Sequence, residues 1–249
     1  SYEGLCEQVP EVIARAREAG VAYMLCICSS LSEFGDISQV ADNNNNVFCS
    51  VGIHPHESGK EPEIDAETLV KLAEHPKTIG IGETGLDFYY ENSPKELQTK
   101  LFKIHIEAAR KSSLPLIVHT RNADIETIQI LKSEMKKEKF FGLIHCFSTS
   151  QELAESAIDL GLYISLSGIV TFDKSNELRN IIKELPVDRL LVETDAPYLA
   201  PVPYRGKCNE PAYVIKTAQF ISNLLGISFE NFAKHTTNNF YKLFTKAKQ

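Results

Sequence analysis

The sequence predicts a parallel α/β fold of the (β/α)8 barrel class (TIM barrel), and three observations carry that prediction. Short apolar runs bounded by turn residues alternate with amphipathic helical patterns along the chain. The 249 residues match the size of one undivided α/β barrel. No repeat, linker or shift of composition interrupts the alternation, so we expect a single domain over residues 1–249.

The first half of the chain is expected to alternate from a leading helix. Apolar residues at helical spacing predict a helix over 5–19, and Gly20 provides its stop. Apolar runs then predict strands at 21–28, 47–52 and 78–82, with helices around 34–41 and 65–74 between them.

The second half continues the same alternation. The segment Ser93-Pro94-Lys95-Glu96 has the spacing of a capping box and predicts the start of a helix that runs to about residue 112. Strands are predicted at 116–119, 142–145, 162–166 and 189–193. Helices are predicted at 125–137, after the Thr149-x-x-Glu152 spacing and at 175–185, and three helical segments follow from Pro211.

The number of strands is one short of a closed barrel. Seven strands are predicted, and the leading helix has no strand before it, whereas a (β/α)8 barrel needs eight. Because the chain starts at Ser1 without a methionine, we expect the first strand to precede Ser1 and to be missing from this sequence. The alternative is an open sheet of seven strands, which would leave two unpaired edges.

Composition limits the classes of function. A net charge of −7 argues against broad electrostatic adhesion to nucleic acid, although it leaves room for a site where metal ions supply positive charge. The six cysteines form no CxxC pair, which indicates a reducing, cytoplasmic setting. No signal peptide or membrane-spanning apolar stretch is present in the sequence, so no membrane partner is expected.

Five metal-type side chains each follow a predicted strand. Since parallel barrels gather the C-terminal ends of their strands on one face, these side chains are expected to meet there. Imidazoles and carboxylates without paired thiolates suit a divalent metal site that activates water. The pattern predicts a metallohydrolase whose candidate residues are His54, Glu83, His119, His145 and Asp195.

Each of these residues also has a simpler interpretation. A single strand-end histidine is more often a core or rim residue, but His119 and His145 lie on adjacent predicted strands, which favours a ligand pair. The segment Gly80–Gly85 matches the dinucleotide fingerprint G-x-G-x-x-G, yet no helix follows it to bind a pyrophosphate. We interpret it as a strand end from which Glu83 projects into the site, against the alternative of a solvated loop glutamate.

Two carboxylates are expected to act together after the last strand. Strand periodicity places Glu193 and Asp195 on the same side, so that one could ligate metal or accept a proton from water while the other orients a neighbour. The alternative is a salt-bridged pair at the barrel rim.

Substrate contacts are predicted around these residues. His54 and His56, separated by a proline and followed by a loop, are expected to be more exposed and to contact substrate, or else to be surface histidines. A phosphate contact is predicted for Arg121 and for a loop with Arg205 and Lys207, which a solvated loop would also explain. The aromatic segment 88–90 could stack bases or form a lid.

At these positions the chain resembles the TatD family of metal-dependent deoxyribonucleases, within the amidohydrolase-like barrels. The resemblance covers nearly the whole sequence, and its motifs are Val51-Gly-Ile-His-Pro-His56, Ile81-Gly-Glu-Thr-Gly-Leu-Asp87, Val118-His-Thr-Arg121, His145-Cys-Phe147, Glu193-Thr-Asp-Ala-Pro-Tyr-Leu199 and Arg205-Gly-Lys-Cys-Asn-Glu-Pro211.

The resemblance implies a role for each metal-type residue. Glu83 would bridge two ions, His119 and His145 would hold one, and Asp195 would hold the other and handle the proton of the attacking water. Glu83 and Asp195 would therefore be the catalytic residues. Family members generally use Mg2+ or Mn2+, with Zn2+ also possible, and many are 3′→5′ exonucleases on single strands that are linked to DNA repair and breakdown.

One family feature has no match in the sequence. The family pattern has an H-x-H at the end of the first strand, which ligates the same ion as Asp195, and no such motif precedes Leu5. We therefore predict a cytoplasmic, monomeric deoxyribonuclease with DNA strand ends as substrate. The alternatives are a barrel hydrolase of a small ester, amide or phosphoester, and a non-catalytic binding protein that truly lacks the H-x-H.

Overall fold

The computed structural model describes residues 9–61, 63–90 and 92–248. The chain divides into two compact units. Unit 1 comprises Ser1–Met24, Cys146–Ala154 and Ile164–Phe240, and unit 2 comprises Leu25–His145, Glu155–Tyr163 and Tyr241–Gln249. The single domain expected over residues 1–249 stays a prediction.

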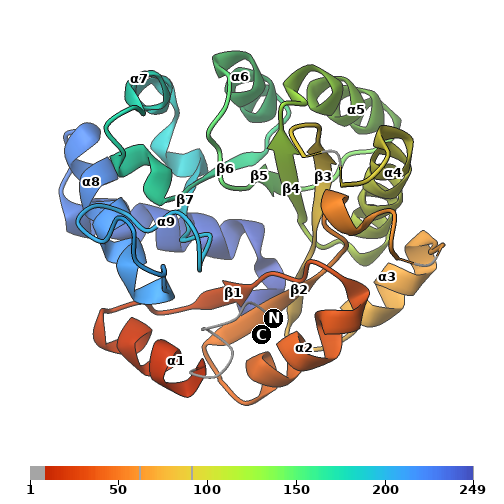
Figure 1. Ribbon diagram of the computed structural model, residues 1–249, viewed down its shortest axis with the longest axis horizontal. Helices are drawn as coiled ribbons and strands as arrows, with labels where there is room; N and C mark the ends of the chain where they lie inside the picture. Colours follow the sequence, from red (N-terminus) through yellow and green to blue (C-terminus); the bar gives the residue numbers. More distant parts are fainter. Residues whose placement is uncertain (1–8, 62, 91, 249) are drawn as a thin grey trace. The chain divides into compact units, whose positions relative to one another are not determined.

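Unit 2 contains the parallel strands that carry most of the predicted metal-type residues. The strands follow in the order β1, whose first residue Met24 belongs to unit 1, then β2, β3, β4 and β5. The pairs β2–β3, β3–β4 and β4–β5 are parallel. Figure 1 shows the helices α2, α3, α4 and α5 beside these strands. The bounds are β1 (Met24–Cys26), α2 (Phe34–Asp42), β2 (Val47–Val51), α3 (Ala66–Ala73), β3 (Thr78–Asp87), α4 (Lys95–Ser112), β4 (Leu116–Arg121), α5 (Asp124–Lys137) and β5 (Gly142–Ile144).

Unit 1 contains the parallel pair β6–β7 and most of the C-terminal helices. Asn239 donates hydrogen bonds to the carbonyl oxygens of Val187 and Leu190, both at 2.9 Å, and so fixes the last long helix to the start of β7. The bounds are α1 (Val9–Glu18), α6 (Gln151–Asp159), β6 (Tyr163–Leu166), α7 (Asn176–Glu184), β7 (Leu190–Val192), α8 (Val214–Leu224) and α9 (Phe229–Leu243), of which α6, β6 and α9 each extend partly into unit 2.

The predicted alternation of strands and helices is confirmed, with three local differences. The helix expected over 5–19 is α1, although residues 5–8 lie outside the described residues, and the strand expected over 21–28 is only Met24–Cys26. The predicted capping box before α4 is wrong, since no side chain caps that helix. The hydroxyl of Ser93 instead lies 2.6 Å from the hydroxyl of Ser58.

The third difference is the length of β3, which was expected to end at residue 82 and continues to Asp87. Glycine makes this possible because Gly82 and Gly85 adopt φ angles of +133° and +140°, which other residues rarely adopt. A Cβ at Gly85 would lie 2.0 Å from the carbonyl oxygen of His119 on β4. The extension brings the last residues of β3 alongside the end of β4.

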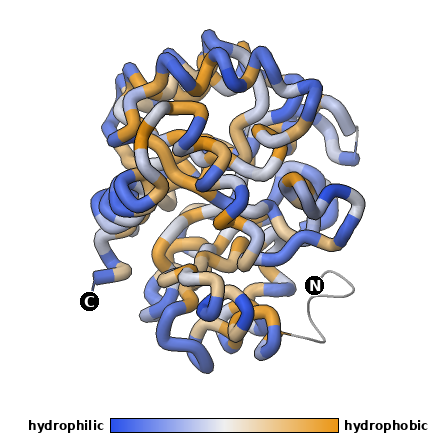
Figure 2. Tube along the Cα trace, turned by 90° about the vertical axis from the view of Figure 1, so that its left-hand side faces the viewer, coloured by the Kyte–Doolittle hydropathy of each residue, from blue (hydrophilic) through white to orange (hydrophobic). Residues whose placement is uncertain are grey.

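Strands β2 and β3 are buried on both faces, as expected for parallel strands between helices. All five residues of β2 are buried, and so are nine of the ten residues of β3. Figure 2 shows hydrophobic and hydrophilic residues alternating along the helical coils. The described cysteines are free thiols, and Cys28 and Cys49 pack in the core. None of the helices in the described part of the chain combines the length and apolar character needed to cross a bilayer.

A buried histidine on α4 positions the segment that follows β2. The Nε2 of His105 accepts a hydrogen bond from the backbone N–H of Ile53 at 3.0 Å, and its Nδ1 lies 2.8 Å from the carbonyl oxygen of Leu101. Since an acceptor at Nε2 requires the proton on Nδ1, the ring is a neutral tautomer that donates to Leu101. Burial lowers the pKa of His105 to about 4.

We expect His105 to make the folded state sensitive to mild acid. The unfolded chain binds this proton below a pKa of 6.5, whereas the folded chain binds it only below about 4. Stability is therefore fully present above pH 6.5 and falls as the pH decreases toward 4, by about 1.4 kcal/mol per pH unit for one group. Urea unfolding of His105→Gln, which keeps an acceptor but cannot titrate, should show a shallower slope from pH 6.5 to 4.5. Equal slopes for both proteins would contradict this prediction.

Candidate metal centre

Backbone hydrogen bonds to neighbouring segments place three of the predicted metal-type residues in unit 2. The N–H groups of His54, Glu83 and His145 donate to carbonyl oxygens at 2.9, 3.2 and 2.9 Å. The acceptors are Ser29, Cys28 and Val118, which lie on adjoining segments of the same unit. Backbone hydrogen bonds between adjoining segments therefore set the positions of these three residues.

An irregularity in β3 turns Glu83 toward the strand ends. Between the pairs Ile81–Leu116 and Thr84–Val118 the register shifts, which leaves one more residue on β3 than on β4. Such bulges redirect a side chain and often occur beside active sites. The backbone of Gly82 approaches Gly52 so closely that a Cβ at position 52 would lie 2.5 Å from the Cα of Gly82. Glycine at position 52 therefore leaves room for the bulge.

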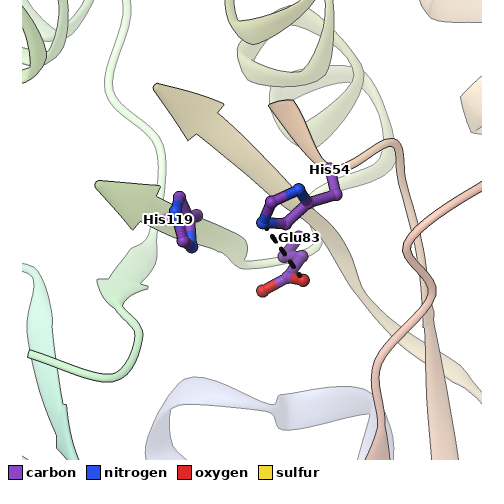
Figure 3. Close-up of side chains that lie close together, drawn as sticks. All are labelled: His54, Glu83 and His119. Atoms are coloured by element: carbon purple, nitrogen blue, oxygen red, sulfur yellow. Dashed lines mark ion pairs between the residues drawn. The ribbon is translucent and has the colours of Figure 1, made fainter. Parts of the chain in front are cut away.

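Three imidazoles of unit 2 converge around the Glu83 carboxylate. Its Oε2 lies 2.9 Å from Nε2 of His145, and its Oε1 lies 3.9 Å from Nε2 of His54. His54, Glu83 and His119 each offer a ligand atom within 4.8 Å of the others, and Figure 3 shows the two rings and the carboxylate converging. The donor set of carboxylate and imidazole, partly shielded from water, fits a divalent cation.

The charges of this group also suit a cation. Burial would raise the pKa of Glu83, but the surrounding imidazoles, first His145 and then His54 and His119, hold it below its usual range. Burial lowers the pKa of His54 to about 3, so this ring is neutral near pH 7. An ionised carboxylate beside neutral imidazole is the protonation state that metal binding requires.

The tautomers divide the histidines into two kinds. Nδ1 of His54 accepts a hydrogen bond from the N–H of His56 at 3.1 Å, so its Nε2 carries the proton and is a donor. Nε2 of His119 lies 3.2 Å from the carboxylate of Asp87 and donates to it, which leaves the lone pair on Nδ1. His119 therefore suits a metal ligand, whereas His54 suits a hydrogen bond to an anion.

Sequence reasoning missed Asp87, the buried carboxylate that organises these rings. Its Oδ2 accepts from Nε2 of His56 at 2.8 Å and of His119 at 3.2 Å, and its Oδ1 accepts from the backbone N–H groups of Tyr89 and Tyr90 at 3.0 and 3.1 Å. Burial would raise its pKa, but these hydrogen bonds and the two imidazoles hold the pKa below its usual range.

The signal for Asp87 was present in the sequence but depended on the length of β3. The sequence predicts that this strand ends at residue 82, which would place Asp87 in the following loop. In the structure it is the last residue of β3 and pairs in register with Arg121. Gln98 on α4 fixes its backbone, accepting from the Asp87 N–H at 2.8 Å and donating to the Asp87 carbonyl oxygen at 3.1 Å.

The predicted substrate-contact residues of unit 2 lie beside this group. His54 and His56 were expected to be exposed, but their side chains are only 14% and 22% exposed. That expectation is wrong because the short 3-10 helix Pro55–Glu57 folds both rings inward, where they contact each other with centroids 4.4 Å apart. The Arg121 guanidinium lies over the rings of Tyr89 and Tyr90, at 4.1 and 4.7 Å from their centroids.

The remaining predicted residues belong to unit 1. Glu193 and Asp195 follow β7, with side-chain oxygens within 4.8 Å of each other, so the prediction that they share a side is confirmed. The periodicity argument is not the reason, because β7 ends at Val192 and Asp195 has a φ angle of +56°. The buried side chain of Asn209, which sequence reasoning did not single out, donates to the carbonyl oxygens of Thr194 and Tyr198 and clamps this turn.

The predicted phosphate-binding loop of unit 1 is built on aromatic rings. The guanidinium of Arg205 lies 3.6 Å from the ring centroid of Phe172, and Nζ of Lys207 lies 5.8 Å from that of Tyr204. These are cation–π contacts on exposed side chains. Phosphate binding by Arg205 and Lys207 stays a prediction.

Parallel strands that present histidines and a carboxylate at their ends define a metal-dependent hydrolase of the α/β barrel class. The family model of the TatD related DNases matches residues 2–245, and the chain belongs to this family. The chain is 42% identical over 243 residues to the uncharacterized metal-dependent hydrolase YcfH of Escherichia coli K12, covering 98% of this chain and 91% of that protein.

Two further comparisons concern function and fold. The chain is 35% identical over 210 residues to the 3′-5′ ssDNA/RNA exonuclease TatD of Klebsiella pneumoniae strain 342, covering 82% and 79% of the two chains. The solved structure of the TatD homologue YJJV from Escherichia coli K12 has a TM-score of 0.91 and 26% identity, covering 98% and 94%. The predicted α/β barrel class is thereby confirmed.

We expect Asp87→Ala to lower the free energy of unfolding by about 3 kcal/mol at pH 7. The substitution removes a buried ionised acceptor and leaves the partners of its four hydrogen bonds unpaired. Asp65→Ala is the matched control, since this exposed carboxylate caps α3 and its loss costs about 1 kcal/mol. Urea unfolding of both variants is the measurement. An Asp87→Ala cost no larger than that of Asp65→Ala would show that the buried carboxylate has little effect on stability.

Proposed function

We propose that this TatD-family hydrolase is a metal-dependent deoxyribonuclease that removes nucleotides from the 3′ end of single-stranded DNA. The observation that carries the proposal is the ionised Glu83 carboxylate with the imidazoles of His54, His119 and His145 around it in unit 2. The similarity to a relative named as a 3′-5′ ssDNA/RNA exonuclease supports the choice of substrate. A net charge of −7 favours contact with a strand end over wrapping of a duplex.

Glu83, His119 and His145 would hold the cation. Glu83 offers two carboxylate oxygens, and the hydrogen bond to Asp87 orients His119 in the way that outer-shell carboxylates orient metal-binding histidines. Mg2+ or Mn2+ are the ions proposed, and the imidazoles favour Mn2+ of the two. When bound, a divalent ion lowers the pKa of water and neutralises charge on the phosphate. A role for Asp195 as a further ligand rests on its sequence motif.

The remaining residues would bind and orient the phosphodiester. The Nε2–H of His54 can donate to a nonbridging oxygen, and the Arg121 guanidinium can pair with a phosphate through two N–H groups. Water attacks phosphorus and the bond from phosphorus to the 3′ oxygen breaks, and the family resemblance assigns the proton of the water to Asp195. The products are a 5′-mononucleotide and a strand with a new 3′ hydroxyl.

Metal binding should stabilise the protein and depend on Glu83. At a free Mn2+ concentration 100 times the Kd, stabilisation is about 2.7 kcal/mol, because the ion binds the folded state. Thermal unfolding with Mn2+ and with EDTA should show a raised Tm for the wild type and no shift for Glu83→Gln. The matched control is His235→Ala, which removes an exposed histidine of unit 1 and should keep the full shift. Equal Tm values with Mn2+ and EDTA for the wild type would refute the metal site.

A direct nuclease assay tests the proposed activity. A 5′-labelled single-stranded DNA oligomer should shorten from its 3′ end with Mg2+ or Mn2+ and remain intact with EDTA. The double variant His119→Ala/His145→Ala should lose more than about 100-fold in rate, since even outer-shell changes cost 10–100-fold. His235→Ala again serves as control. An intact oligomer, together with hydrolysis of a small phosphoester, would favour the alternative of a small-molecule barrel hydrolase.

A further inference from the structure

Two exposed tyrosines and an arginine lie at the end of β3 and β4, beside the candidate metal centre. Tyr89 is 53% exposed and Tyr90 is 44% exposed. Their ring centroids are 4.7 Å apart at an interplanar angle of 85°. The Arg121 guanidinium lies over both rings. We call these three residues the tyrosine platform.

The tyrosine platform is tied to the metal-type residues through a single buried side chain. One oxygen of Asp87 accepts the backbone N–H groups of Tyr89 and Tyr90, and the other accepts from His56 and His119. The same carboxylate therefore holds the backbone of the platform and the rings of the centre in one arrangement. A mobile lid would not have its backbone fixed to the site in this way.

A ring contact brings the platform within reach of the same substrate. The Tyr90 ring meets the His56 ring edge to face, with centroids 5.4 Å apart and an interplanar angle of 88°. The His56 ring in turn lies 6.5 Å from the ring of His119. A phosphate beside His119 would therefore carry its neighbouring nucleoside toward the exposed tyrosines.

The chemistry of the platform matches an unpaired nucleotide. Aromatic rings stack on any nucleobase, so they bind without sequence preference, and a guanidinium pairs with the adjoining phosphate. A base inside a duplex is already stacked and paired and cannot lie on such a surface without being extruded. Peptides and small esters offer no combination of flat base and phosphate that uses all three side chains.

We propose that Tyr89, Tyr90 and Arg121 form a base-stacking subsite that selects unpaired, single-stranded nucleic acid irrespective of sequence. The inference rests on the proposed nuclease function for the identity of its ligand. It adds the element that places a terminal nucleotide next to the metal-type residues, and it assigns preference for single strands to unit 2.

Binding measured without cleavage tests the subsite. Protein is titrated in EDTA into a 5′-fluorescein-labelled thymidine decamer. It is also titrated into the same strand with its three 3′-terminal nucleotides abasic, so that the backbone is kept and the bases are missing. Fluorescence anisotropy gives the Kd for each strand. We expect the wild type to bind the intact strand about 10-fold more tightly, because stacking on aromatic residues contributes about 1–3 kcal/mol per base. In Tyr89→Leu/Tyr90→Leu the ratio of the two Kd values should fall to about 1.

Matched variants separate stacking from other effects. Tyr89→Phe/Tyr90→Phe keeps the rings and should keep the 10-fold ratio, and Phe141→Leu, which removes an exposed aromatic residue elsewhere on unit 2, should keep it too. Arg121→Gln should weaken both strands alike and reduce the slope of log K against log salt by about 1. Urea unfolding checks the leucine variant, since exposed substitutions change stability by only about ±0.5 kcal/mol.

The outcomes distinguish the subsite from the nuclease activity. A wild type that binds both strands equally, or a leucine variant that keeps the ratio, overturns the subsite even if the enzyme cleaves DNA. A ratio that depends on the tyrosines supports the subsite even if no metal restores cleavage, in which case the proposed nuclease function fails alone.

Discussion

The buried carboxylate of Asp87 is the interaction on which the candidate site depends. It accepts hydrogen bonds from two imidazoles and from two backbone N–H groups, so one side chain sets the orientation of His56 and His119 and the path of the chain after β3. A buried charge is costly unless it is fully hydrogen-bonded, and here every partner is a donor. The rings of His56 and His119 and the tyrosine platform are consequently parts of one hydrogen-bond network.

The backbone of β3 makes that network possible. Glycines at 82 and 85 take conformations that side chains rarely adopt, and the bulge between Ile81 and Thr84 turns Glu83 toward its imidazole neighbours. A Cβ at position 82 would collide with the carbonyl oxygen of Ile117, and one at position 85 with the carbonyl oxygen of His119. The G-x-G-x-x-G spacing that resembles a nucleotide fingerprint thus serves strand packing in this chain.

Electrostatics divide the roles among the histidines. Burial keeps His54 neutral, and its acceptor at Nδ1 places the proton on Nε2, which faces the Glu83 carboxylate at 3.9 Å, whereas Nε2 of His119 donates to Asp87. Residues of one chemical type therefore suit different tasks, anion contact and metal binding. His105 is different again, because both of its nitrogens are bonded inside the core and it acts only as a support.

The sequence by itself determined the alternation of strands and helices, the family and the metal-type residues at the strand ends, because these depend on local periodicity and on motifs. The length of β3 and the inward position of His54 and His56 were decided only by the tertiary structure. A bulge interrupts the two-residue periodicity by which a strand is recognised in a sequence. The burial of a side chain depends on which distant segments pack against it. Asp87 was overlooked for the same reason: two of its four donors, His56 and His119, lie on segments that only the tertiary structure brings to it.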